Sequence, residues 1–306
     1  MTLTLATGAP LSRFSFGTMQ WGGGADAAEA RRLYDRCREA GITAFDTAVG
    51  YADGRAETLL GQFVKAERDA VHVATKIGYD RDHSPATLTA QWDRSRRQSG
   101  LEQVDLLYLH RWSGTDLSAT FDWLAARQEA GEFRQIGVSN FAAWQVMKAQ
   151  DAARAAGTRI DALQPMLNLV KRQAQVELLP MAEDQGIAVL SYSPLGGGLL
   201  TGKYARGETG RIRSDSHYAA RYAPDWMSRA AEDLSALAAE TGHDPATLAV
   251  AWVAARGVTP IVSARSTKQL APSLAAMSLD LDPELDARLS ALTPTPPPAT
   301  DRLEEA

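Results

Sequence analysis

Cysteine is almost absent from this sequence. The only one among 306 residues is Cys37, so no intramolecular disulfide can form. It lies in a segment with helical spacing of apolar residues, where we interpret it as a half-buried packing residue and not a reactive thiol. The stability of the chain must therefore come from a packed core, for which 306 residues of 45% hydrophobic composition suffice.

Long hydrophobic runs are also missing. The longest apolar run, residues 248–255, is far shorter than the roughly 20 residues that span a bilayer. The N-terminal residues do not combine a basic start with an apolar block, as a secretory signal does. We expect a cytoplasmic protein with no membrane association.

The chain has no excess of positive charge. Its 32 basic and 37 acidic residues give a formal net charge of −5, and the basic residues are scattered among acidic ones. Nothing offers a nucleic-acid backbone a counterion-releasing surface, so we expect no nucleic-acid partner.

What the sequence does contain is a repeated alternation of short apolar runs and longer amphipathic stretches. The predicted strands are residues 14–17, 44–45, 71–75, 104–109, 135–138, 162–167, 188–192 and 259–262. Glycines that follow helical segments, such as Gly41 and Gly100, support the count. The pattern predicts one α/β domain over residues 1–306, an eight-stranded (β/α)8 TIM barrel. A doubly wound nucleotide-binding sheet is the alternative, but no G-x-G-x-x-G follows the first strand.

Three segments depart from the repeat. Residues 2–11 predict an N-terminal β-hairpin that closes the barrel bottom. The stretch 193–246 between the last two strands is long and rich in Gly, Arg and Tyr, and it predicts a lid-like loop over a bound ligand. Residues 294–306 carry several prolines and predict a C-terminal surface extension.

Polar residues stand at the carboxyl ends of the predicted strands, where active sites of this architecture form. They are Asp46, Lys76, His110, Ser139, Asn140, Gln164, Tyr192 and Ser193. Because successive members are separated by about one strand–helix unit, we expect all of them to face one mouth of the barrel.

Asp46, Tyr51, Lys76 and His110 together predict an acid site. A phenol donates a proton more readily at neutral pH when an ammonium stabilises its phenolate, and Lys76 would be that ammonium. Asp46 would keep Lys76 charged, and His110 could hold a substrate oxygen. From spacing alone, a structural Asp–Lys pair with a rim tyrosine is an equally good interpretation.

The run Phe45-Asp46-Thr47-Ala48-Val49-Gly50-Tyr51, followed by Thr75-Lys76 and Leu109-His110, resembles the aldo-keto reductase family. Gly137-Val138-Ser139-Asn140-Phe141 and Tyr192-Ser193-Pro194-Leu195 resemble further family segments in the same order, so the similarity covers nearly the whole chain. The resemblance implies that Tyr51 is the general acid, that Lys76 lowers its pKa, that Asp46 supports Lys76 and that His110 orients the carbonyl. It implies no metal, and reversible reduction of an aldehyde or ketone by a nicotinamide cofactor.

The resemblance also implies a cofactor groove. Ser139, Asn140 and Gln164 would bind the nicotinamide amide and Tyr192 would stack on its ring. The backbone of Ser193, Leu195 and Gly197, with the Lys203 side chain, would follow the pyrophosphate. Plain core packing for Tyr192 and a flexible hinge at Gly197 are the other interpretations.

The last groove residues would be Ser263, Arg265, Gln269 and Ser273, after the eighth strand. Arg265 has the planar donor fork suited to a 2′-phosphate, so we expect NADPH rather than NADH, although a surface arginine is an alternative. Ser263 departs from the glycine that the family often has here. Pro272 and Ser273 replace the acidic residue and asparagine that often contact the adenine, and Pro272 should bend the helix there.

We expect Trp21 and Trp112 to line an apolar or aromatic pocket for a small carbonyl substrate, although either could be a packing residue. Two other functions remain open. One is a redox-sensing regulatory subunit of the same fold, as the β subunits of channels are. The other is a lyase or isomerase with Lys76 as Schiff-base nucleophile, against which the adjacent Asp46 argues. The oligomeric state is not readable from the sequence.

Overall fold

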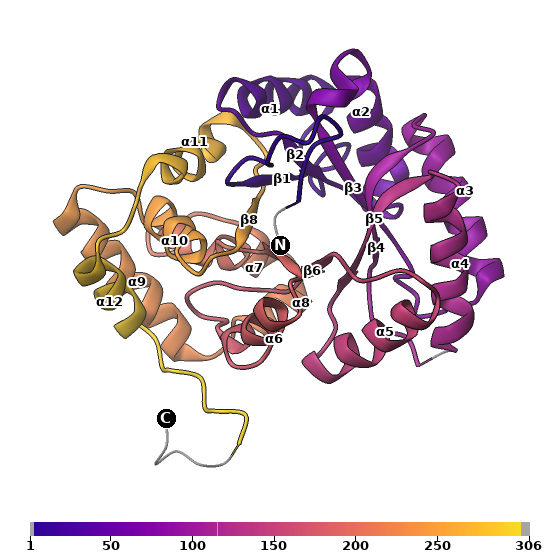
Figure 1. The fold of residues 1–306 in the computed structure, drawn as a ribbon. Coiled ribbons are helices and arrows are strands. Elements are labelled where there is room, and N and C mark those ends of the chain that lie inside the picture. Colours follow the sequence, from indigo (N-terminus) through magenta and orange to yellow (C-terminus); the bar gives the residue numbers. More distant parts are fainter. Residues whose placement is uncertain (1–2, 115, 301–306) are drawn as a thin grey trace.

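Eight parallel strands close into a barrel in the computed structural model, which describes residues 3–114 and 116–300. Each strand pairs with its neighbours in sequence, and the last pairs with the first (Figure 1). The strands are β1 (Ser15–Gly17), β2 (Ala44–Asp46), β3 (His72–Ile77), β4 (Val104–Leu109), β5 (Phe133–Ser139), β6 (Ala162–Gln164), β7 (Ala188–Tyr192) and β8 (Thr259–Val262). The predicted (β/α)8 fold is confirmed, although β6 ends earlier than predicted, at Gln164.

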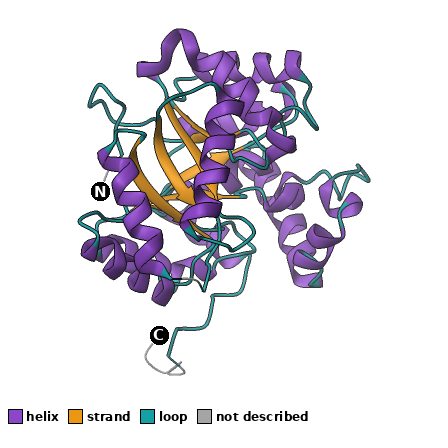
Figure 2. Ribbon diagram, turned by 90° about the vertical axis from the view of Figure 1, so that its right-hand side faces the viewer, coloured by secondary structure: helices purple, strands orange, loops and turns teal. Residues whose placement is uncertain are grey.

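Helices surround the barrel on the outside, so the strands lie enclosed in the side view of Figure 2. They are α1 (Ala27–Glu39), α2 (Arg55–Val64), α3 (Pro85–Ser99), α4 (Leu117–Glu129), α5 (Ala143–Ala155), α6 (Leu178–Asp184), α7 (Arg211–Ser214), α8 (Ser216–Arg221), α9 (Asp225–Thr241), α10 (Pro245–Ala254), α11 (Thr267–Ala275) and α12 (Pro283–Ala291). The side chains of Asp26, Ser84 and Asp116 cap α1, α3 and α4 by accepting backbone N–H bonds, which fixes where each helix begins.

The predicted N-terminal hairpin is present. An antiparallel bridge joins Thr4 to Pro10, and the N–H of Leu5 donates to the carbonyl of Ala9. Leu3 is buried against interior residues of the barrel, including Leu106 and Ile261. The hairpin therefore covers the end of the barrel opposite the mouth, and residue 2 of the predicted range lies outside the described residues.

The long stretch after β7 is only partly a loop. Residues 193–222, which we name the lid segment, contain irregular turns and the short helices α7 and α8. From residue 225 the chain forms α9, which packs with α10 in a second apolar cluster that includes Leu234 and Trp252. The predicted lid-like loop is thus confirmed in its first half, whereas its second half belongs to the outer layer of the barrel.

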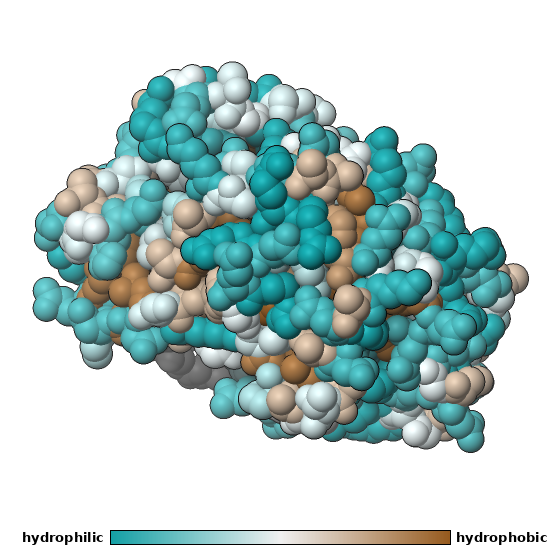
Figure 3. Space-filling view, turned by 90° about the horizontal axis from the view of Figure 1, so that it is seen from above, coloured by the Kyte–Doolittle hydropathy of each residue, from teal (hydrophilic) through white to brown (hydrophobic). Residues whose placement is uncertain are grey.

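Hydrophilic side chains predominate on the face of the molecule shown in Figure 3, and apolar residues form small, separated patches between them. Among the described residues, no helix has the length and apolar character needed to cross a membrane. After α12, residues 294–300 of the predicted extension form no helix or strand, and residues 301–306 lie outside the described residues.

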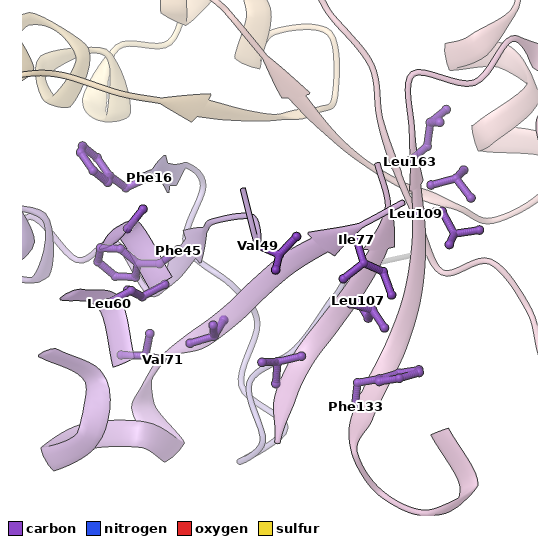
Figure 4. Packing of buried hydrophobic residues seen from close by; sticks show 14 of the residues in the cluster. Phe16, Phe45, Val49, Leu60, Val71, Ile77, Leu107, Leu109, Phe133 and Leu163 are labelled. Atoms are coloured by element: carbon purple, nitrogen blue, oxygen red, sulfur yellow. The ribbon is translucent and has the colours of Figure 1, made fainter. Parts of the chain in front are cut away.

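The strands divide their side chains between two layers. Val71 and Ile77 near β3, Leu107 and Leu109 of β4 and Leu163 of β6 belong to the main apolar cluster between sheet and helices (Figure 4). The alternate residues, such as Ala74 and Leu106, face the barrel interior. The same alternation carries Asp46, Lys76 and Gln164 into the interior at the carboxyl ends of β2, β3 and β6, which creates the polar layer described next.

Candidate active site

A buried ion pair stands at the ends of β2 and β3. Lys76 is fully buried, and its Nζ donates to Oδ1 of Asp46 and, over 2.7 Å, to the carbonyl of Thr47. Burial lowers the pKa of Lys76, and the charge of Asp46 and its hydrogen bond oppose that shift. Asp46 therefore favours the ammonium form of Lys76 inside the barrel.

Tyr51 leaves β2 in a tight turn and stands over this pair. The Lys76 Nζ lies 5.1 Å from the Tyr51 ring centroid. In the turn, Ala52 and Asp53 have φ of 48° and 59° before Gly54 at 91°, so two non-glycine residues occupy the left-handed region. This conformation directs Tyr51 toward the mouth and lets α2 begin at once at Arg55.

Burial, followed by the charge of Asp46, raises the pKa of Tyr51 well above its ordinary value. The resemblance implies that Lys76 lowers that pKa, and stabilisation of the phenolate by Lys76 stays a prediction. The net direction in the folded chain is upward because desolvation of the phenolate is the largest effect. Tyr51 consequently holds its proton at neutral pH, which is the form that an acid needs.

His110 follows β4 and faces the same space. Its ring centroid lies 6.0 Å from that of Tyr51 and 5.0 Å from that of Tyr79. Burial and the nearby cations Lys76 and Arg111 lower the pKa of His110 to about 3. The imidazole is therefore neutral over the physiological range and can donate one hydrogen bond to a substrate oxygen without carrying charge.

Four of the predicted cofactor residues converge beside this group. Ser139 Oγ donates to the carbonyl of Gln164 over 3.0 Å, and Gln164 Nε2 donates to Asp46 Oδ2 over 2.8 Å. Tyr192 Oη donates to Asn140 Oδ1 over 2.7 Å. Asn140 has φ of 58°, and its amide donates to the His110 carbonyl over 2.9 Å. Amides and hydroxyls thus line one wall, and Asp46 joins that wall to Lys76.

The lid segment continues the groove. Ser193 has φ of 58°, and its carbonyl accepts a hydrogen bond from the Asn168 amide over 2.9 Å. Gly197 has φ of 66°, and a Cβ placed there would lie 2.7 Å from the Tyr218 ring. Leu195 is half-buried against both main apolar clusters. The backbone from Ser193 to Gly198 is therefore held in one conformation by packing from the lid segment.

Three cations gather at this end of the groove. Burial, followed by the charges of Arg265 and Arg211, lowers the pKa of Lys203, although Glu208 acts in the opposite direction. In the described part of the chain, none of the three has a carboxylate oxygen within the 4.0 Å of an ion pair. A cluster of unpaired cations beside glycine backbone is suited to a pyrophosphate and a second phosphate.

The residues after β8 lie only partly as predicted. Ser263, Arg265 and Gln269 are exposed, and the Arg265 Nε donates to Gln20 Oε1 over 2.9 Å. The Gln269 Oε1 accepts the Arg265 N–H over 3.1 Å. The N–H of Thr267, at the start of α11, donates to Glu29 Oε1 over 3.0 Å, so a carboxylate already occupies this donor at the helix N-terminus.

Ser273 requires a correction. Its exposed fraction is 1%, so it cannot reach an adenine from α11. Pro272 lies inside that helix, which is not broken, and its carbonyl accepts a hydrogen bond from Thr247 Oγ1 over 2.8 Å. Both residues therefore lie on the interior face of α11 and do not face the groove.

Trp21 requires a second correction. It is fully buried, and its ring centroid lies 5.6 Å from that of Phe16 and 5.5 Å from that of Phe63, so it packs in the core and does not line the open mouth. Trp112, in contrast, is half-buried and lines an open cavity beside Asn140. Only one of the two predicted pocket tryptophans borders the mouth.

Two residues near the site were not predicted. Tyr108 is fully buried below Lys76, with its ring centroid 6.0 Å from Nζ, and Gly137 has no Cβ because one would lie 2.4 Å from that ring. Glu57 is buried in α2 and accepts hydrogen bonds from Ser95 and, over 2.6 Å, from Thr75, the residue before Lys76. The alternation of β4 places Tyr108 two residues before His110 and could have revealed it, whereas nothing in the sequence distinguishes Glu57.

Comparison with known proteins agrees with this geometry. The model of the Aldo/keto reductase family matches residues 13–293. The chain belongs to the aldo/keto reductase family of oxidoreductases. This aldo/keto reductase is 31% identical to the uncharacterized oxidoreductase YrpG of Bacillus subtilis (strain 168), with 95% of this chain and 94% of the relative covered.

Two further relatives cover almost the whole of this aldo/keto reductase. A probable voltage-gated potassium channel subunit beta of Oryza sativa subsp. japonica is 29% identical over 96% of this chain and 97% of its own length. The structure of the glycerol dehydrogenase AKR11B4 from Gluconobacter oxydans matches with a TM-score of 0.79 and 26% identity, over 98% of each chain. Within residues 3–114 and 116–300 of this aldo/keto reductase, no three His, Cys, Asp or Glu side chains gather as metal ligands would.

Proposed function

We propose that this aldo/keto reductase reduces an aldehyde or ketone to the alcohol, reversibly, with NADPH as the reductant and Tyr51 as the proton donor. The observation that carries the proposal is the convergence of a protonated phenol, a buried lysine–aspartate pair and a neutral imidazole at one mouth of the barrel. A purely structural Asp–Lys pair would not require the Tyr51 turn or the His110 ring beside it.

The residues of the groove fit a nicotinamide dinucleotide. Ser139, Asn140 and Gln164 present donors and acceptors suited to a carboxamide, and Tyr192 supplies an aromatic face. The cluster of Lys203, Arg211 and Arg265 supplies charge for phosphates, and Arg265 is the residue that we assign to the 2′-phosphate of NADPH. When bound, the nicotinamide supplies a hydride to the carbonyl carbon.

The protein itself supplies the proton for the carbonyl oxygen and stabilises the negative charge that then develops on the tyrosine. Tyr51 gives its hydroxyl proton to the carbonyl oxygen, and His110 donates a hydrogen bond to that oxygen. The tyrosinate that remains is stabilised by the Lys76 ammonium, which Asp46 keeps charged. In alcohol oxidation, Tyr51 takes the proton back.

The experiment that tests the proposal is a titration of the purified protein with NADPH and NADH, followed by quenching of tryptophan fluorescence. Addition of 4-nitrobenzaldehyde should then cause loss of the nicotinamide absorbance, and the Tyr51→Phe variant should not show it. Failure to bind either nucleotide contradicts the cofactor assignment. Binding without turnover by a broad panel of carbonyls contradicts the reductase.

A regulatory role is the second candidate, because a relative that covers 96% of the chain is named a potassium channel subunit beta. Co-purification with a membrane protein would favour it, whereas rapid turnover that depends on Tyr51 would favour the enzyme. A Schiff base on Lys76 has no such support, since this amine is fully buried and bound to Asp46.

A further inference from the structure

An open cavity adjoins the catalytic mouth on the side of β4 and β5. Its volume is about 430 Å³, and its lining residues are Arg81, Arg111, Trp112, Asn140 and Gln145. Asn140 belongs to the wall that we assign to the nicotinamide amide, and Arg111 follows His110 directly in the sequence. A substrate held with its carbonyl at Tyr51 and His110 would therefore extend its remaining atoms toward this cavity.

The arginines of the cavity have no acidic partner. In the ranges 3–114 and 116–300, no carboxylate oxygen lies within 4.0 Å of the guanidinium of Arg81 or Arg111. The nearby carboxylates are bound elsewhere: Asp80 accepts hydrogen bonds from the Gln91 amide and Asp82 accepts from the N–H of Ser84. The cavity thus carries two guanidinium groups that form no ion pair with the described residues, although the carboxylates of Asp80 and Asp82 flank Arg81 in the sequence.

The Arg111 side chain packs on and hydrogen-bonds to Tyr79. Its Cζ lies 3.9 Å from the centroid of the Tyr79 ring, and its Nη2 donates to the Tyr79 hydroxyl over 2.7 Å. The Tyr79 ring in turn packs edge-on against His110. The half-buried guanidinium is thus stacked on a ring that is 54% exposed and that packs against the catalytic imidazole, and its other N–H donors make no hydrogen bond within the described residues.

The lid segment adds a further cation to this rim. Arg221 lies with its Cζ 5.1 Å from the Tyr218 ring centroid, and its charge acts on Tyr192, whose hydroxyl binds Asn140. It too has no carboxylate oxygen within 4.0 Å in the described part of the chain. Arg221 therefore adds a cation near Tyr192, whose hydroxyl binds Asn140 at the wall of this cavity.

We propose that the substrate carries an anionic group, a carboxylate or a phosphate, that Arg111 binds in this cavity with Arg81 beside it. The inference deepens the proposed function and rests on it, because it names the substrate class of the same site. It replaces the apolar pocket expected from the sequence, in which Trp21 has no part. Trp112 becomes the apolar wall that packs against the carbon skeleton between the carbonyl and the anion.

The test uses two aldehydes that differ in charge and little in size, 4-carboxybenzaldehyde and its methyl ester, methyl 4-formylbenzoate. We expect the kcat/KM for the carboxylate to exceed that for the ester by about tenfold to a hundredfold, since a charge-assisted hydrogen bond contributes roughly 1.5–3 kcal/mol. The compound 4-formylphenyl phosphate, compared with both, distinguishes the two anions. An equal or higher kcat/KM for the ester overturns the proposal while leaving the reductase intact. Reduction of none of them, nor of 4-nitrobenzaldehyde, overturns the proposed function itself.

The variant that isolates the charge is Arg111→Gln. It should lower kcat/KM for the carboxylate about tenfold or more relative to the ester, mainly through KM, and Arg111→Lys should restore part of the loss. The matched control is Arg97→Gln, which removes the same charge from the exposed face of α3 and should leave both substrates unchanged. An equal loss for the two substrates in Arg111→Gln would mean that Arg111 only supports Tyr79 and His110, and would overturn the proposal.

A binding measurement gives a readout that does not depend on turnover. In the presence of NADP⁺, isothermal titration calorimetry should detect 4-nitrobenzoate more readily than 4-nitrobenzamide, and Arg111→Gln should remove the difference. Equal binding of the acid and the amide by the unchanged protein would count against an anion site in this cavity.

Discussion

The two sides of the barrel mouth are built differently. On the β2–β4 side, Asp46 and Lys76 are buried and hydrogen-bonded to one another, and they emerge directly from strands. On the β7–β8 side, Lys203 is half-buried and Arg265 is exposed, and both belong to loops. The first side has paired charges inside the core, and the second has unpaired charges at the surface.

This difference corresponds to what each side would do in the proposed reaction. A proton transfer needs groups fixed relative to one another, and burial between strands provides that. A long, charged ligand needs to enter and leave, which loops and unpaired cations allow. Substitutions on the two sides should therefore have different consequences.

The largest expected effect is on the rate. Tyr51→Phe should lower kcat by about 10²- to 10⁴-fold, because the variant has no general acid at the carbonyl oxygen. Binding of NADPH, followed by tryptophan fluorescence, should persist, since Tyr51 lies outside the groove residues. Unchanged turnover would remove Tyr51 from its assigned role.

A matched pair of lysine substitutions compares the stability of the two sides. Lys76→Met leaves the buried carboxylate of Asp46 without its cation and should lower the free energy of unfolding by about 3–5 kcal/mol. Lys203→Met removes a cation that forms no ion pair with the described residues, and it should change the free energy of unfolding by about 0.5 kcal/mol or less. Urea denaturation measures both, and similar losses would contradict the contrast between the sides.

Arg265→Ala removes an exposed side chain that hydrogen-bonds only Gln20 among the described residues, so it acts mainly through the ligand. It should weaken NADPH by about tenfold to a hundredfold and NADH much less, because only NADPH carries the 2′-phosphate. Fluorescence titrations with both nucleotides give the ratio. Equal weakening would show that Arg265 contacts a part that the two share.

The last expected effect is on the pH dependence of stability. The folded-state pKa of His110 is lowered to about 3, below its ordinary value near 6.5, and burial also lowers those of His72 and His83. The unfolded chain therefore binds protons that the folded chain does not, and stability is lost as pH falls below about 6.5. Each imidazole contributes a slope of at most about 1.4 kcal/mol per pH unit. Urea midpoints measured from pH 7 to pH 4 should fall less in His110→Gln than in the unchanged protein. An identical fall in both would mean that groups other than His110 cause the pH dependence.

The strand-borne part of the site could be read from the sequence. The period of two in β3, and the polar residue at the end of each apolar run, placed Asp46, Lys76 and His110 at one mouth. The direction of the Tyr51 pKa could not be read, because it depends on how completely the folded chain desolvates the phenol.

Loop and helix-face residues were harder to predict. Trp21 follows the first strand, and Ser273 follows the predicted cofactor segment after the eighth. The side chains of both are buried in the protein interior, and their positions in the sequence do not reveal that direction. The cavity at Arg111 is lined by residues of different loops, such as Trp112 after β4 and Asn140 after β5, and Arg111 packs on Tyr79 from the loop after β3. A charged residue directly after His110 was the available signal.

The turn after Tyr51 also bears on how this protein can change during evolution. Left-handed conformations at Ala52 and Asp53 cost free energy that glycine would largely recover, by roughly 1 kcal/mol at each position. Selection for thermal stability alone would favour glycine there, at the risk of a less firmly placed phenol. At these two positions, selection for thermal stability would therefore favour glycine, whereas selection for catalytic turnover would favour the residues present.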